Sequence, residues 1–191
     1  MQTKKQDIAK LLEQCLQGKH SAQLEIYKYY YKAMYNTALR ILNDRFEAED
    51  IMQESFLTAF SKLGTFKSES KYGDALVPFG SWLKRIVINK SLTQLKKNKK
   101  LSSWQQNSET IENLSIVEEY DEKADFSKIK AKEVLEAIQT LKTNYKTVLT
   151  LSLIEGYDNE EIAEILNITN QSVRTTISRA KSKLKKILLK N

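Results

Sequence analysis

The side chains best suited to recognising an anionic partner lie near the end of the chain. From residue 170 to residue 191 there are seven basic residues and no acidic one. Amides, hydroxyls and guanidiniums are interleaved there, and such groups on a helix can bond to base edges and phosphates of DNA. A solvated face of an ordinary helical bundle is the alternative interpretation. The candidate DNA-binding residues are Asn170, Gln171, Ser172, Arg174, Thr175, Ser178, Arg179 and Lys181.

The segment that must position these side chains has the pattern of a helix-turn-helix. We expect a short helix over Glu160–Leu166, a tight turn over Asn167–Thr169 and a longer helix from Asn170 to about Leu188. Asp158 is suited to cap the first helix, and an asparagine at 167 tolerates left-handed dihedral angles. The predicted shared core consists of Ile162, Leu166, Ile168, Val173 and Ile177.

A second group of polar side chains lies on a helix predicted from about Glu47 to Leu63. Its apolar stripe contains Ile51, Met52, Ser55, Phe56, Ala59 and Phe60. Asp50, Gln53 and Glu54 lie across from this stripe. Asp50 and Glu54 are the one tempting carboxylate pair, but no histidine or third acid supports them as a metal site. We therefore expect no catalytic residues, no metal ligands and no cofactor, and the protein is not expected to be an enzyme.

The remaining helices of the N-terminal half are also amphipathic. We expect one helix over Ile8–Leu16 and a longer helix for which Ser21 is the N-cap. A loop is expected over Thr65–Pro78. A basic helix is expected to begin near Phe79, with Trp82 and Ile86 on its apolar stripe. The second of these helices is predicted to bury the face that contains Leu24, Tyr27, Tyr31, Tyr35, Ala38 and Leu42.

Composition and charge define the domain organisation. Only five Gly and one Pro occur among 191 residues, which predicts an all-α protein. The net charge is +7, with 18 basic and 10 acidic residues over 1–100, 1 and 7 over 101–126, and 12 and 7 over 127–191. We expect two small helical domains, 1–100 and 127–191, joined by a flexible acidic linker. The basic excess favours nucleic acid as a partner, with membrane phosphate as the alternative.

Cysteine content and hydropathy exclude several other classes. One cysteine, Cys15, cannot form an intramolecular disulfide, and with His20 alone it cannot form a zinc site. No segment has the length and apolar character of a signal peptide or a membrane span. We therefore expect a cytoplasmic protein without membrane insertion.

Two blocks of sequence resemble one family. The segment EGYDNEEIAEILNITNQSVRTTISRAKSKLKKIL resembles region 4 of the extracytoplasmic-function sigma factors of the sigma-70 superfamily. YKYYYKAMYNTALRILNDRFEAEDIMQESFLTAF, followed by SWLKRIVINKSLTQLKK, is similar to their region 2. The order and spacing of the blocks agree with the family. Thr93, where many members have an aspartate, and Asn167, where glycine is commoner, depart from it.

The resemblance implies an alternative sigma factor that binds core RNA polymerase and promoter DNA. It implies that Asp50, Gln53 and Glu54 contact the arginine-rich clamp helices of the polymerase. The flap of the polymerase is implied as a further contact of the protein. The recognition helix is implied to read the minus 35 element. An anti-sigma factor is a further partner known for many members. Recognition and melting of the minus 10 element are implied for Trp82, Lys84, Arg85 and Asn89.

Several alternatives remain open on the sequence alone. A stand-alone helix-turn-helix transcriptional regulator is the second functional interpretation, although residues 1–100 have the pattern of neither a receiver domain nor a phosphate-binding loop. Trp82 is equally interpretable as a core anchor, and the acidic face of Asp50 as merely solvated. The acidic segment 101–126 fits both a simple tether and a segment that enters a channel built for nucleic acid.

Overall fold

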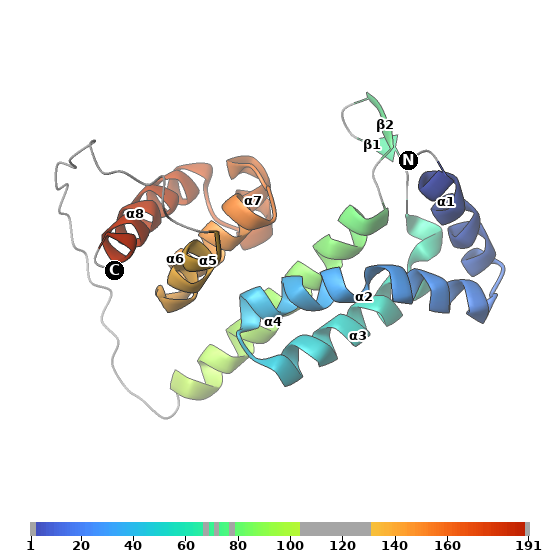
Figure 1. Ribbon diagram of the computed structural model, residues 1–191, viewed down its shortest axis with the longest axis horizontal. Helices are drawn as coiled ribbons and strands as arrows, with labels where there is room; N and C mark the ends of the chain where they lie inside the picture. Colours follow the sequence, from blue (N-terminus) through green and yellow to red (C-terminus); the bar gives the residue numbers. More distant parts are fainter. Residues whose placement is uncertain (1–2, 67–68, 71–72, 77–78, 104–130, 190–191) are drawn as a thin grey trace. The chain divides into compact units, whose positions relative to one another are not determined.

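The chain is helical and divides into two compact units, Met1–Lys97 and Asn98–Asn191. The computed structural model describes residues 3–66, 69–70, 73–76, 79–103 and 131–189 (Figure 1). Among these residues only two short strands accompany the helices. The all-α prediction is therefore confirmed, with one small β-hairpin as an addition.

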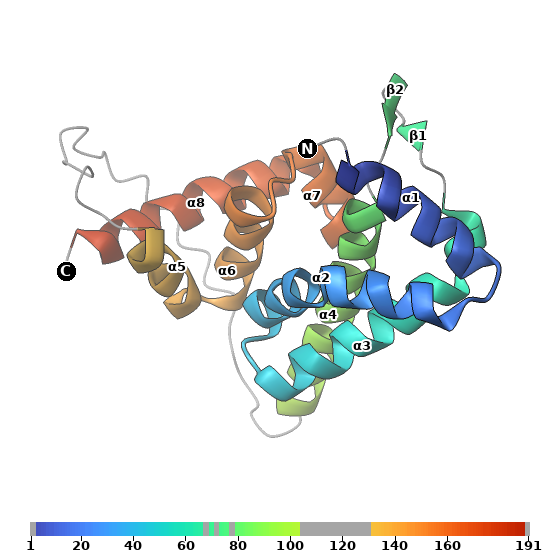
Figure 2. The same cartoon turned by 45° about the vertical axis from the view of Figure 1, so that its right-hand side comes forward.

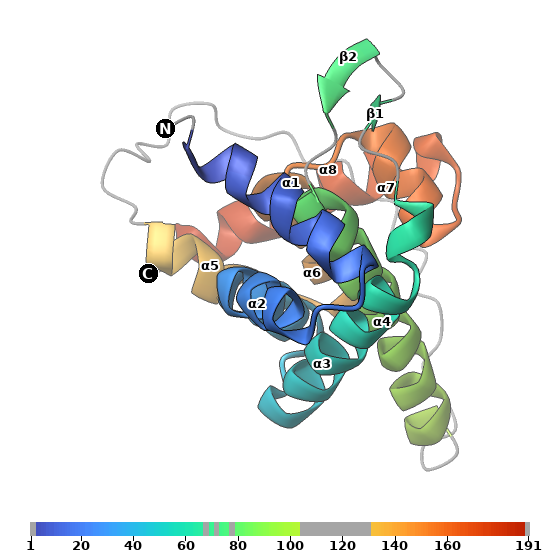
Figure 3. The same ribbon diagram turned by 90° about the vertical axis from the view of Figure 1, so that its right-hand side faces the viewer.

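The described residues of the first unit form four α-helices. In chain order its elements are α1 (Thr3–Leu16), α2 (His20–Leu42), α3 (Arg45–Ser61), the 3-10 helix η1 (Leu63–Thr65), β1 (Glu69–Ser70), β2 (Gly73–Leu76) and α4 (Phe79–Ser103). Helix α2 lies against both α1 and α3 (Figure 3). Asn43 adopts a left-handed conformation with φ 58° directly after α2, and the Asp44 side chain accepts a hydrogen bond from the Glu47 backbone N–H at 2.9 Å. This turn sets the antiparallel course of α2 and α3.

Side chains from α2, α3 and α4 form the core of the first unit. The buried stripe predicted for α3 is confirmed, since Ile51, Met52, Ser55, Phe56 and Ala59 are buried and Phe60 packs against them. The Tyr27 ring of α2 lies 4.8 Å from the Phe56 ring, measured between centroids. From α4 the core receives Phe79, Leu83 and Val87.

The predicted start and buried face of α2 are wrong in part. The helix begins at His20, with Lys19 at the N-cap position, so Ser21 is not the cap. Leu24 is 51% exposed and Tyr31 36% exposed, whereas Ala22, Ile26, Met34 and Ile41 are buried. Tyrosine carries an apolar ring and a polar hydroxyl, so a run of tyrosines marks the margin of a buried face as readily as its centre.

Two further differences concern the segment around α4. The stripe of α4 is centred on Leu83, Val87 and Ile88, while Trp82 and Ile86 are half-buried at its margin. The segment 65–78, expected to be a loop, contains β1 and β2 as an antiparallel pair in which Glu69 is opposite Leu76. Strands this short leave no detectable alternation in sequence.

The second unit packs three shorter helices against one long one. Its elements are α5 (Ala131–Thr140), α6 (Thr143–Leu149), a π-helical turn η2 (Thr150–Ile154), α7 (Asn159–Leu166) and α8 (Asn170–Leu188). Helix α8 contacts α5, α6 and α7 (Figure 2). Ile162, Val173 and Ile177 are buried as predicted and Leu166 is half-buried, but Ile168, which lies in the turn, is 42% exposed. Of the predicted linker, 101–103 belong to α4, and 104–126 lie outside the described residues.

The start of α4 lies in close contact with α2. A Cβ atom added at Gly80 would lie 2.7 Å from Cε1 of Tyr30, whose ring packs against Tyr29 and Phe79. Burial, with a smaller effect of Tyr29, raises the pKa of the Tyr30 hydroxyl.

We expect Gly80→Ala to lower the free energy of unfolding by about 2 kcal/mol, because the Tyr30 ring must move. Urea denaturation measures this. Gly64→Ala, where nothing lies within 4 Å, is the control, and equal stability of the two variants would contradict the prediction.

A buried lysine makes the stability of the second unit depend on pH. The side chain of Lys146 in α6 is 9% exposed, and burial lowers its pKa from the usual 10.5. The folded state therefore binds the proton of the Lys146 ammonium group less tightly than the unfolded state does. Lys146 thus lowers the free energy of unfolding at neutral pH. This loss disappears as the pH rises through the pKa of Lys146 in the folded state and then its pKa in the unfolded state. We expect Lys146→Met to add about 1 kcal/mol to the free energy of unfolding at neutral pH and less at alkaline pH. Lys142→Met, at an exposed lysine, is the control, and a gain independent of pH would contradict the prediction.

Candidate functional site

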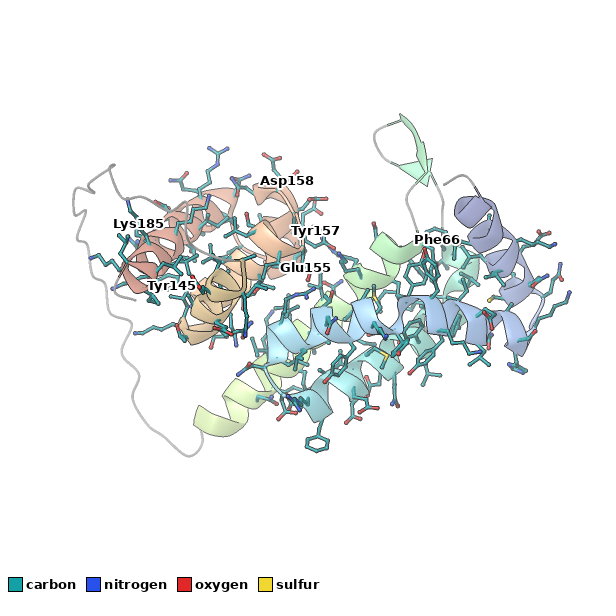
Figure 4. All side chains as sticks on the ribbon, viewed as in Figure 1. Phe66, Tyr145, Glu155, Tyr157, Asp158 and Lys185 are labelled. Carbon is teal, nitrogen blue, oxygen red and sulfur yellow. The ribbon has the colours of Figure 1, made fainter. Side chains whose placement is uncertain are left out.

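Local hydrogen bonds define the helix-turn-helix. At the start of α7, Asp158 Oδ1 accepts from the Glu161 N–H at 2.8 Å, and Glu161 Oε2 accepts from the Asp158 N–H at 2.9 Å. Figure 4 labels Asp158 at this end of α7. Asn167 ends α7 in the left-handed region with φ 54°, and Thr169 caps α8 by accepting from the Ser172 N–H at 3.2 Å. The predicted turn and both helices are confirmed.

The polar face of α8 is accessible. We call its exposed members the recognition surface: Gln171, Ser172, Arg174, Thr175, Ser178, Arg179 and Lys181. The buried stripe of Val173, Ile177, Ala180 and Leu184 fixes which side of the helix faces out. The guanidiniums of Arg174 and Arg179 form no hydrogen bond or ion pair with any residue that the structure describes. A shallow depression on this surface is lined by Gln171, Ser172, Thr175, Thr176 and Arg179. Positive charge that no acid neutralises is thus available to an anionic partner.

Three of the eight predicted DNA-binding side chains form hydrogen bonds within the protein. Asn170 is half-buried, and its Nδ2 donates to Glu160 Oε1 of α7 at 3.3 Å. The Ser172 hydroxyl lies 2.8 Å from the Thr169 hydroxyl. Thr175 Oγ1 donates to the backbone oxygen of Gln171 at 2.9 Å, which leaves its oxygen free to accept.

Helix α3 presents the three predicted polar side chains, Asp50, Gln53 and Glu54, in two different states. Asp50 and Gln53 are exposed. The carboxylate of Glu54 is 60% exposed but pairs with Lys90 of α4, with Nζ and Oε2 3.1 Å apart. Glu54 therefore also joins α3 to α4, a role that the sequence did not indicate.

Sequence reasoning missed two apolar side chains beside these acids. Phe46 is 83% exposed and Leu57 is 71% exposed. With Asp50 and Gln53 they occupy positions i, i+4, i+7 and i+11 of α3, which places all four on one side of the helix. We call Phe46, Asp50, Gln53 and Leu57 the α3 surface. Large apolar residues among acids on an exposed face are typical of a protein-docking surface.

The predicted melting residues lie along α4. Trp82, Lys84 and Arg85 are half-buried and Asn89 is exposed. The Trp82 ring lies 5.2 Å from the Phe66 ring and 5.6 Å from the Phe79 ring, measured between centroids. Figure 4 labels Phe66 near the start of α4. This packing agrees with Trp82 as an anchor of the aromatic cluster.

The described part of the chain contains one buried cysteine and no metal-binding cluster. No group of three or more His, Cys, Asp or Glu side chains in these residues could hold a metal ion. Cys15 is buried in the first unit, and burial raises the pKa of its thiol. None of the described helices combines the length and apolar character needed to cross a membrane.

Family profiles match both units. Sigma-70 region 2 matches residues 26–101, and Sigma-70, region 4 matches residues 131–184. The RNA polymerase sigma-H factor of Pseudomonas aeruginosa is 30% identical over 196 residues, which cover 98% of this chain and 96% of the relative. The chain belongs to the sigma-70 family. The ECF RNA polymerase sigma factor SigW of Bacillus subtilis is 29% identical over 187 residues, covering 95% and 96% of the two chains.

Solved structures of sigma factors share the fold of this sigma-70 family member. The sigma factor RpoE from Bartonella quintana, in complex with the anti-sigma factor NepR, matches with a TM-score of 0.56 at 19% identity, covering 86% of this chain and 94% of that one. CnrH, in complex with the cytosolic domain of CnrY, matches with a TM-score of 0.54 at 21% identity, covering 95% and 96%. The protein is an extracytoplasmic-function sigma factor, and it directs promoter-specific initiation of transcription.

Proposed function

We propose that the two units divide the work of this sigma factor. Residues 1–100 bind core RNA polymerase and open the minus 10 element, residues 127–191 read the minus 35 element, and the acidic segment 101–126 links them. The observation that carries the proposal is the pair of exposed guanidiniums, Arg174 and Arg179, on α8, a helix that contains no acidic residue. The second helix of a helix-turn-helix enters the major groove.

Within the recognition surface the side chains have different roles. Arg174, Arg179 and Lys181 are exposed cations, which suit phosphates and the acceptor edge of guanine. Gln171 and Ser178 are exposed and suit base edges, and the Thr175 oxygen can accept. Ser172, held by Thr169, stabilises the start of α8 and presents its hydroxyl to the backbone of the DNA.

The α3 surface is the proposed docking site for the clamp helices of the polymerase. Asp50 and Gln53 accept hydrogen bonds from arginines of the partner, and Phe46 and Leu57 supply apolar contact beside them. Glu54 adds negative charge to the same helix while holding Lys90. Exposed apolar area gives affinity that salt does not screen, and the carboxylates set register.

Helix α4 is the proposed site of minus 10 recognition and melting. Lys84 and Arg85 lie along it as cations, and Asn89 offers an exposed amide for an unpaired base. The Trp82 ring packs against the rings of Phe66 and Phe79, which stabilises this helix, and it lies at the margin of that aromatic cluster. The chemistry is binding of separated strands, and the sigma factor itself makes and breaks no covalent bond.

A protein that covers these surfaces would inhibit the factor. Two solved structures with this fold contain a partner chain, and in one of them the partner is the anti-sigma factor NepR. The exposed apolar side chains of the α3 surface suit such a partner as well as the polymerase. An anti-sigma factor is therefore a proposed partner. The flap of the polymerase is the proposed partner of the second unit.

Co-purification tests the polymerase assignment. The tagged full-length chain is mixed with core RNA polymerase and passed over a size-exclusion column. We expect one stable complex of factor and core. A chain that binds DNA by itself as a dimer and does not associate with polymerase would instead be a stand-alone regulator.

A further inference from the structure

One contact inside the helix-turn-helix joins an acidic residue to a predicted base reader. Asn170, the first residue of α8, donates from Nδ2 to Oε1 of Glu160 in the first turn of α7 at 3.3 Å. Glu160 is exposed and Asn170 is half-buried. The two residues are 10 positions apart in sequence, so this contact exists only because the turn brings the starts of both helices together.

The chemistry of the contact fixes which way the amide faces. An ionised carboxylate only accepts hydrogen bonds, so the nitrogen of Asn170 must face Glu160 and its carbonyl oxygen must face away. One N–H remains beside that oxygen. A donor next to an acceptor is the pair that asparagine uses to bond adenine at N7 and N6 in the major groove.

We propose that Glu160 is a positioning residue that orients Asn170 to read one adenine of the minus 35 element. The inference rests on the proposed function of α8 as the recognition helix. Without Glu160 the amide can rotate by half a turn and present donor and acceptor in the opposite order, which removes its preference for adenine. The exposed contact is weak in the free protein and strengthens in the groove, where water is displaced.

Glu160 also lowers the affinity of the protein for DNA of any base sequence. Its negative charge lies beside the recognition surface and repels phosphate. Removing the charge should raise affinity for random DNA about threefold, while removing the hydrogen bond should lower base discrimination on the order of tenfold. A variant that only disturbed the fold would lower both quantities.

The test uses the holoenzyme, formed from the full chain and core RNA polymerase. Random-sequence duplex DNA is selected by the wild type and by four variants, Glu160→Ala, Glu160→Gln, Asn170→Ala and the double alanine variant, and the bound DNA is sequenced. Glutamine keeps an acceptor for Asn170 without the charge, but its own NH2 can also donate, so it fixes the orientation of the Asn170 amide only in part. Glu164→Gln, which removes one charge from the same helix, is the matched control.

We expect the wild type to prefer adenine at one position of the upstream element and Glu160→Gln to keep part of that preference. Glu160→Ala, Asn170→Ala and the double variant should each lose that preference to the same extent. Both Glu160 variants should bind random DNA more tightly than the wild type. Thermal unfolding of each variant verifies that it is folded. If Glu160→Ala is unstable, Asn170→Ala still tests the same contact, because it leaves α7 unchanged.

Three results would overturn the inference. Adenine preference retained in Glu160→Ala would show that Asn170 needs no positioning, and adenine preference retained in Asn170→Ala would show that Asn170 does not read it. Loss of preference in Glu160→Gln equal to that in Glu160→Ala would assign the effect to charge. A wild-type holoenzyme that selects no upstream element at all would overturn the proposed function of α8 itself, so the two failures are distinguishable.

Discussion

Replacing Arg174 and Arg179 with glutamate is expected to abolish promoter-specific binding and to leave binding to core polymerase intact. Both guanidiniums are exposed and free of acidic partners among the described residues. The double reversal changes the charge of the recognition surface by four units and places two carboxylates against phosphate. Lost base and phosphate contacts together should weaken specific binding by on the order of 100-fold or more. Competition binding between promoter and random DNA measures this ratio.

The matched control changes the same charge elsewhere in the second unit. Lys132 and Lys142 are exposed and lie outside α8. Their reversal to glutamate should lower binding to all DNA slightly and leave the ratio of specific to random binding unchanged. If the Arg174 and Arg179 reversal behaved like this control, α8 would not be the reading helix.

Replacing Asp50 and Glu54 with lysine is expected to abolish binding to core polymerase without affecting DNA binding by the second unit. The proposed partner of α3 is rich in arginine, so the reversal replaces attraction by repulsion along one helix face. We expect affinity for core polymerase to fall by on the order of 100-fold. Fluorescence anisotropy of the labelled factor titrated with core enzyme measures it.

The ion pair between Glu54 and Lys90 requires a separate control. Reversing Glu54 also breaks its contact with α4, which spans 36 positions of sequence. Lys90→Gln breaks the same pair from the other side and leaves both acids on α3. This variant should bind polymerase as the wild type does. Equal loss in Lys90→Gln and in the double reversal would assign the effect to the packing of α4 against α3 and not to a docking surface.

The elements that sequence predicted well have strong local signals. The helix-turn-helix was predicted almost to the residue, because Asp158 caps α7, Asn167 tolerates the left-handed turn and the apolar stripe of α8 keeps a helical period. The buried stripe of α3 was predicted for the same reason. In α2 the predicted buried face was wrong in part: Ala38 and Leu42 are buried as predicted, but Leu24 and Tyr31 are exposed, because tyrosines do not mark the centre of a buried face.

The parts of the site that sequence did not predict depend on tertiary structure. The contact of Glu160 with Asn170 and that of Glu54 with Lys90 join different helices, and no periodicity encodes them. The exposure of Phe46 was not predicted because this residue precedes the expected start of the helix at Glu47, although its offset from the α3 stripe was a usable signal.

Transcription in vitro tests the central claim most directly. Fragmented DNA from the source genome is transcribed by core RNA polymerase with and without the purified chain, and the 5′ ends of the transcripts are mapped. The result expected of a sigma factor is a set of new, discrete start sites that share an upstream element and disappear with the Arg174 and Arg179 reversal. Start sites identical with and without the chain, together with sequence-specific DNA binding by the chain alone, would contradict the claim.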